Sequence, residues 1–143
     1  MRTQFLQVVM LAGITACTSA PEKPSAETHI VVKENNNLVL HQGKKWQVPA
    51  HMMNELRAME RILNTHDTKH HYVAALGDSL QAHLEALTSS CTMEGDAHDE
   101  LHKWLVPFME KTDAIPALTD STRQAEAVHE LQQAFVGFNR FFE

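Results

Sequence analysis

The sequence has no basic patch, no second long apolar run and very little cysteine. Lys and Arg number 12 against 18 Asp and Glu, which gives a formal net charge of −6 and makes a nucleic-acid partner unexpected. Beyond residue 16, no apolar run is long enough to cross a bilayer as a helix. The two cysteines are Cys17 and Cys91, so at most one disulfide bond is possible.

The N-terminal region has the pattern of a secretion signal. A short positively charged start is followed by a mostly apolar run over residues 5–14, which is too short to span a bilayer. The run ends in the motif Ile14-Thr15-Ala16-Cys17. This motif resembles the lipobox of bacterial lipoproteins, in which an aliphatic residue and two small residues precede a cysteine. The resemblance implies a signal peptide over residues 1–16.

Bacterial lipoproteins are cut before the lipobox cysteine, whose new amino terminus then carries the acyl chains. Carried over to this sequence, Cys17 is the lipidated residue, and the protein attaches to a membrane through its lipid. Thr18 follows instead of Asp, which in enteric-type sorting favours the outer membrane. We therefore expect a protein of the bacterial cell envelope that is lipid-anchored in the outer membrane and faces the periplasm. The alternative is an ordinary signal cut nearby, with Cys17 unmodified.

Residues 17–28 are expected to form a tether between the lipid and the folded domain. The residues after Cys17 are mostly small or polar and include two prolines, a composition typical of flexible linkers. The folded part is therefore expected to begin at residue 29.

Residues 29–47 have the pattern of a short β-hairpin. Two aliphatic runs, at 30–32 and 38–40, flank three consecutive asparagines at 35–37, and asparagine favours turns. Trp46 is the expected anchor that packs this segment against the residues that follow.

From residue 48 onward the apolar residues recur with a period of about 3.5, which predicts helices. A single helix cannot bury such a stripe, so we predict a mostly α fold, an antiparallel four-helix bundle over residues 48–143. Asp96 is expected to cap the third helix, and Ser121 and Gln124 form a capping-box pattern at the fourth. The four apolar stripes are Met52, Leu56, Met59 and Leu63; Val73, Leu76, Leu80, Leu84 and Leu87; Ala97, Leu101, Trp104, Leu105 and Phe108; and Val128, Leu131, Phe135, Phe138 and Phe142.

The segment from Cys91 to His102 holds the densest set of metal-binding donors. Cys91, Met93, His98 and His102 follow one another as Cys-x-Met-x4-His-x3-His. Four residues apart on the opening turns of a predicted helix, the two histidines project from one face and can share a metal ion. Thiolate, thioether and imidazole together favour copper, especially Cu(I), with zinc second. The sequence therefore predicts a transition-metal site.

Met52 is a further candidate ligand. In an up-down-up-down bundle the first and third helices start at the same end, so Met52 can approach the Cys-Met-His segment from across the bundle. The alternative for all of these residues is a structural role. Free cysteine is among the most buried residue types, methionine fills cores, and the histidines can be exposed.

Two further readings of the histidines are less favoured. The run from His98 to His102 differs from the zinc-peptidase motif H-E-x-x-H because Asp99 stands where the motif has its catalytic glutamate. No third ligand is recognisable downstream, so we do not expect an enzyme. A b-type haem bundle is the other interpretation, but Leu, Phe and Trp already fill the predicted apolar stripes and leave little room for a haem. Its axial ligands would be His102 or His83 with Met52 or Met59.

The main alternative to metal binding is a cofactor-free module that binds another envelope protein in an interaction or chaperone-like role. The acidic composition, the tether and the methionine-rich first helix suit such adaptable binding.

Two segments resemble a family of small helical bacterial proteins that are secreted or lipid-anchored. The first is Leu40-His41-Gln42-Gly43-Lys44-Lys45-Trp46-Gln47-Val48, leading to Met52-Met53, and the second runs from Cys91 through His98 and His102 to Pro107. His41 stands where that family often has asparagine. The resemblance covers most of residues 38–143. It implies that the Cys-Met-His segment is the distinctive part of the protein, and it implies no enzymatic reaction.

Overall fold

Four helices account for most of the residues that the computed structural model describes, which are 37–67 and 73–143. The helices are α1 (Ala50–Thr65), α2 (Val73–Ser89), α3 (Gly95–Ala114) and α4 (Ser121–Phe141), with a short 3-10 helix, η1 (Ile115–Ala117), after α3. The predicted mostly α class with four helices is confirmed. None of the described helices is long and apolar enough to span a membrane. The predicted signal, Cys17, the tether and the first part of the predicted hairpin lie outside the described residues.

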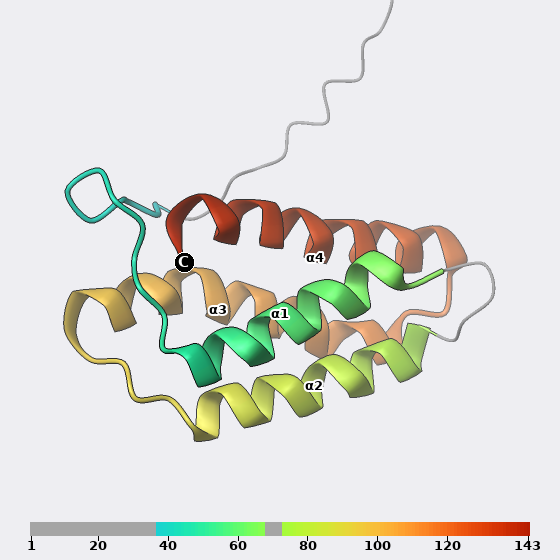
Figure 1. The fold of residues 1–143 in the computed structure, drawn as a ribbon. Coiled ribbons are helices and arrows are strands. Elements are labelled where there is room, and N and C mark those ends of the chain that lie inside the picture. Colours follow the sequence, from blue (N-terminus) through green and yellow to red (C-terminus); the bar gives the residue numbers. More distant parts are fainter. Residues whose placement is uncertain (1–36, 68–72) are drawn as a thin grey trace, which may run out of the picture. The chain divides into compact units, whose positions relative to one another are not determined.

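Consecutive helices run in opposite directions, and each packs against two neighbours (Figure 1). Helices α1 and α3 each contact α2 and α4, so α1 and α3 face each other across a diagonal. The starts of α1 and α3 and the ends of α2 and α4 therefore lie together. We call this the Ala50 end; it is on the left in Figure 1.

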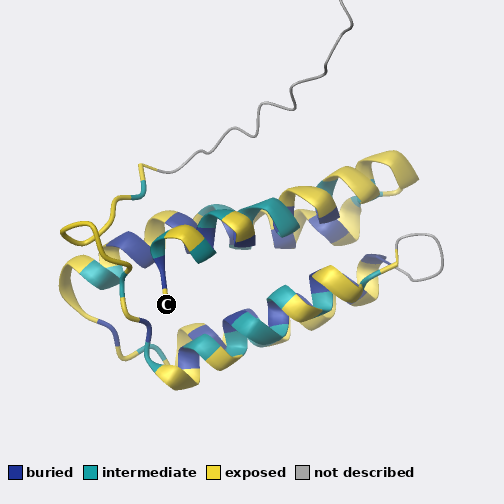
Figure 2. Ribbon diagram, turned by 45° about the horizontal axis from the view of Figure 1, so that its top comes forward, coloured by how far each residue is buried: buried dark blue, intermediate teal, exposed yellow. Residues whose placement is uncertain are grey.

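The apolar stripes of the sequence form the core. Apart from Ala97, which is half-buried against the core, every stripe residue is buried. Figure 2 shows these buried positions recurring along each helix between exposed ones. Burial of this apolar surface is what holds the four helices together.

An aromatic cluster joins α3 to α4 within this core. The Trp104 and Phe108 rings stack with centroids 4.8 Å apart, and Phe135 and Phe138 pack on Trp104 with centroids at 5.1 and 4.9 Å. Phe142 stacks on Phe138 at 4.8 Å. The Trp104 Nε1–H group also donates a hydrogen bond of 2.8 Å to the Ala134 carbonyl, so its one polar group is satisfied inside the core.

The described part of the predicted hairpin, residues 37–47, contains no strand and instead makes a tight turn. His41 and Lys44 exchange two backbone hydrogen bonds of 2.9 Å. Gln42 and Gly43, between them, both have positive φ angles, of 53° and 80°. Two successive residues with positive φ are typical of a two-residue hairpin turn, and glycine adopts this conformation without steric cost. This turn therefore lies at Gln42–Gly43, away from the asparagine cluster.

Trp46 anchors the segment before α1: its side chain packs against the core, as predicted, and its backbone bonds to the residues that end α4. Its backbone N–H donates to the Phe141 carbonyl at 2.7 Å, and its carbonyl accepts from the Glu143 N–H at 2.9 Å. The N–H of Val48 donates to the Glu143 carbonyl at 2.8 Å. These bonds form a short parallel bridge between the residues before α1 and those that end α4.

Two predicted helix caps lie elsewhere in the structure. Asp120, rather than Ser121, precedes α4, and its carboxylate accepts the Arg123 N–H at 2.9 Å. Asp96 lies in the first turn of α3 and does not precede it, because the helix already begins at Gly95 after Glu94. Both predictions missed the start of the helix by one or two residues.

Two glycines inside helices are expected to respond oppositely to alanine. At Gly137 an added Cβ would meet nothing within 4 Å, so Gly137→Ala should stabilise the protein by about 0.5–1 kcal/mol through helix propensity. At Gly77 the same atom would lie 3.3 Å from Ile115 Cγ2 in η1, so Gly77→Ala should gain less or destabilise. Urea unfolding of both variants measures the difference. An equal gain at both positions would contradict the close packing of α2 on η1.

Candidate functional site

A pocket of about 210 Å³ lies at the Ala50 end, among α1, the end of α2 and the first half of α3. It is lined by Met52, Leu87, Thr88, Cys91, His98, Leu101, His102 and Leu105. Four of the five candidate ligands from the sequence analysis are therefore in its lining, and most of the remaining wall is leucine. The wall contains no carboxylate.

Helix α3 supplies the two histidines. His98 and His102 are one turn apart, and their rings meet edge to face with centroids 4.3 Å apart. His98 is half-buried and His102 is exposed. Gly95, the first residue of α3, has a φ angle of 63°, which lets the chain turn sharply into the helix just before the pair. The expectation that both imidazoles project from one face of the helix agrees with this geometry.

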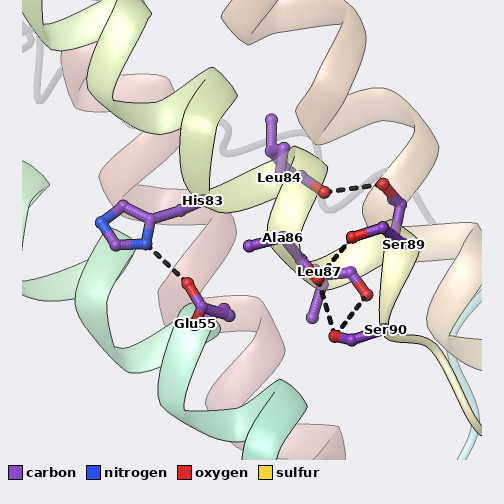
Figure 3. A network of polar contacts seen from close by, with 8 residues as sticks. Glu55, His83, Leu84, Ala86, Leu87, Ser89 and Ser90 are labelled. Atoms are coloured by element: carbon purple, nitrogen blue, oxygen red, sulfur yellow. Dashed lines mark hydrogen bonds and ion pairs between the residues drawn. The ribbon is translucent and has the colours of Figure 1, made fainter.

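The end of α2 positions Cys91, which is a free thiol in this structure. The Cys91 backbone N–H donates to the Thr88 carbonyl at 3.4 Å, so the last turn of α2 leads directly into the pocket wall. Hydroxyl groups strengthen this turn, since Ser90 Oγ donates to the Ala86 carbonyl at 2.7 Å (Figure 3). The Cys91 side chain is half-buried and packs against the core.

His51 connects helix α1 to the end of α2, next to Cys91. Its Nε2 atom lies 2.9 Å from the Ser90 carbonyl oxygen, which connects the first turn of α1 to the end of α2. The next residue, Met52, is only 1% exposed and places its side chain on the pocket wall. Met52 thus reaches the pocket from across the bundle, as the placement of helix starts suggested.

Met93 is the one candidate ligand that does not line the pocket. It is 9% exposed and belongs to the hydrophobic core. The structure therefore brings together Met52, Cys91, His98 and His102 and leaves Met93 out of the lining.

Glu100 lies between the two histidines in sequence and has a structural role that the sequence analysis did not identify. It is 3% exposed, and its carboxylate accepts the backbone N–H of Val39 and a 2.5 Å hydrogen bond from Lys103 Nζ. The indole N–H of Trp46 donates to the Val39 carbonyl at 2.7 Å, so both backbone polar groups of Val39 are hydrogen-bonded. No local pattern in the sequence indicates that a glutamate in the first turns of a helix will bind a backbone group 61 residues away, as Glu100 binds Val39.

His83, the alternative to His102 as a haem ligand, contacts a carboxylate. His83 Nδ1 lies 2.7 Å from Glu55 Oε2, so the pair joins α2 to α1 (Figure 3). Met59, one of the two methionines considered as the opposite ligand, is fully buried in the core. These contacts give both residues structural functions and do not favour the haem interpretation.

Within residues 37–67 and 73–143, no three histidine, cysteine, aspartate or glutamate side chains are placed to hold one metal ion together. No protein-family model, curated protein or solved structure matches the chain. A function for this protein therefore has to be inferred from the pocket at the Ala50 end and from the donor atoms on its wall.

Proposed function

We propose that the protein binds a transition-metal ion, copper in preference to zinc, in the pocket at the Ala50 end. The observation that supports this proposal is that two imidazoles, one thiol and one thioether line a single small pocket. These are the donor types that transition metals, and copper above all, favour in proteins. The role is sequestration, delivery or sensing of the metal, without catalysis.

The side chains around the pocket suit a bound ion more than an organic ligand. A volume of about 210 Å³ is below the usual range for pockets that take drug-sized molecules, which is about 300–1,000 Å³. His98 and His102 supply two ligands from one helix face. Leu87, Leu101 and Leu105 add apolar surface beside them on the pocket wall.

We also propose that the protein is a bacterial lipoprotein. The support is the motif Ile14-Thr15-Ala16-Cys17 after a short apolar run. Signal cleavage before Cys17, acylation of its new amino terminus and a tether to residue 28 would hold the protein at the outer membrane, facing the periplasm. A short hairpin within residues 29–47 and an antiparallel four-helix bundle complete this proposal.

Metal binding is tested by removing both histidines. The wild-type protein should take up close to one equivalent of copper, and the double variant with His98→Ala and His102→Ala should lose this uptake. Neither ring is buried in the core, so the double variant should keep its helical content and its unfolding midpoint. Elemental analysis after desalting measures the metal, and circular dichroism checks the fold.

His129→Ala is the control, since His129 is exposed on α4 and does not line the pocket. This variant should keep full copper uptake. A folded wild-type protein that takes up neither copper nor zinc would refute the proposal, and the cofactor-free interaction module would then be the better explanation.

A further inference from the structure

We infer that Met52 is a ligand of this site and that the bound ion is monovalent Cu(I), held by Met52, His98 and His102. This inference rests on the proposed metal-binding function and specifies its ligand set and the charge of its ion.

The choice of Met52 depends on which other side chains line the pocket with His98 and His102. Cys91 lines the same pocket, but it is not placed with His98 and His102 in a group that can hold an ion within the described part of the chain. We therefore assign the third ligand to a residue of another chemical type. The Met52 thioether is that ligand: it is the only methionine side chain in the pocket lining, and it is almost fully buried there.

The ligand set and the pocket wall both favour a monovalent soft ion. Zn²⁺ is nearly always four-coordinate in structural sites, with ligands drawn from cysteine, histidine and carboxylates, and the pocket lining offers only three residues of these types, Cys91, His98 and His102. Thioether ligands select Cu(I). The wall also offers no carboxylate to balance charge, and burying an ion among leucines costs far more for a double charge than for a single one.

Coordination by Met52 has a structural consequence. Met52 belongs to α1 and both histidines belong to α3, and these two helices lie on a diagonal, each packing mainly on α2 and α4. An ion held by all three side chains would link α1 to α3 at the Ala50 end. Because three ligands brought together by the fold would bind Cu(I) more tightly than the unfolded chain does, Cu(I) should raise the unfolding temperature of the wild-type protein.

The test compares two methionine-to-leucine variants of the full protein. Met52→Leu removes the thioether and nearly conserves volume, so the core should remain packed. Met59→Leu makes the same change two turns along α1, at another fully buried methionine that does not line the pocket. The affinity for Cu(I) is measured under anaerobic, reducing conditions by competition with a coloured Cu(I) chelator, and Zn(II) affinity is measured by a parallel competition.

Met52→Leu should weaken Cu(I) binding by roughly tenfold or more, as loss of a ligand or its support does at metal sites, and should remove most of the thermal shift caused by Cu(I). Met59→Leu should change neither quantity. The wild-type protein should bind Zn(II) much more weakly than Cu(I).

Two outcomes would overturn this inference and still leave transition-metal binding in the pocket intact. In one, Met52→Leu retains wild-type Cu(I) affinity while the double histidine variant loses it. In the other, the wild-type protein binds Zn(II) as tightly as Cu(I). Failure of the wild-type protein to bind either ion would instead refute the proposed function and this inference together.

Discussion

Trp104→Ala should destabilise the protein by about 3–5 kcal/mol, a large part of the 5–15 kcal/mol typical of a small domain. Trp104 is 2% exposed and contacts the rings of Phe108, Phe135 and Phe138. Its removal leaves a cavity between α3 and α4 that the surrounding rings can fill only in part. Urea unfolding followed by circular dichroism measures the free energy of unfolding.

Two variants separate the parts of this effect. Trp104→Phe keeps an aromatic ring but loses the hydrogen bond to the Ala134 carbonyl, so it should cost much less than alanine. Trp46→Ala removes the other tryptophan, which is only half-buried, and should also be milder. A loss below about 1 kcal/mol for Trp104→Ala would contradict the packing of α3 on α4 through this cluster.

Phe142→Ala should destabilise the protein by about 3–5 kcal/mol. Phe142 follows α4, is fully buried and stacks on Phe138 with an angle of 12° between the ring planes. Loss of the Phe142 ring removes apolar contacts at the Ala50 end, close to the backbone bridge between Phe142 and Trp46. The same urea titration applies.

The matched control is Phe141→Ala, one residue earlier. Phe141 is only half-buried, and its contribution to the bridge is its backbone carbonyl, which alanine retains. Phe141→Ala should therefore cost clearly less than Phe142→Ala. Similar losses at the two positions would show that Phe142 is not the core residue described above.

The helices and their core faces could be predicted from the sequence because burial imposes a periodic pattern on it. Met52, Leu56, Met59 and Leu63 recur at the spacing of one helix face, and all four are buried in α1. Such a pattern is local, so it needs no knowledge of the partner helix. The conformation of residues 37–47 was less accessible. There the turn depends on positive φ angles at Gln42 and Gly43, whereas the three asparagines predicted a turn at residues 35–37.

The candidate site could be predicted only in part. The spacing of His98 and His102 fixes them on one face of α3, and that relation is local. Whether a buried methionine also lines the pocket depends on the path of the chain between helices, and a periodic pattern of apolar residues does not predict that path. Met52 therefore joins the pocket and Met93 does not, although both were candidates from sequence. The contact between Glu100 and Val39 was beyond prediction for the same reason.

The bridge between the residues before α1 and those after α4 also determines how the domain bears mechanical load. A pull applied at residue 37 would first stress the contact of Val39 with Glu100, and then the bonds from Trp46 and Val48 to Phe141 and Glu143. Only after these had broken would the force unwind α1. Tension from that side would thus be carried into α3 and the end of α4 before it reached the first turn of α1, which holds Met52.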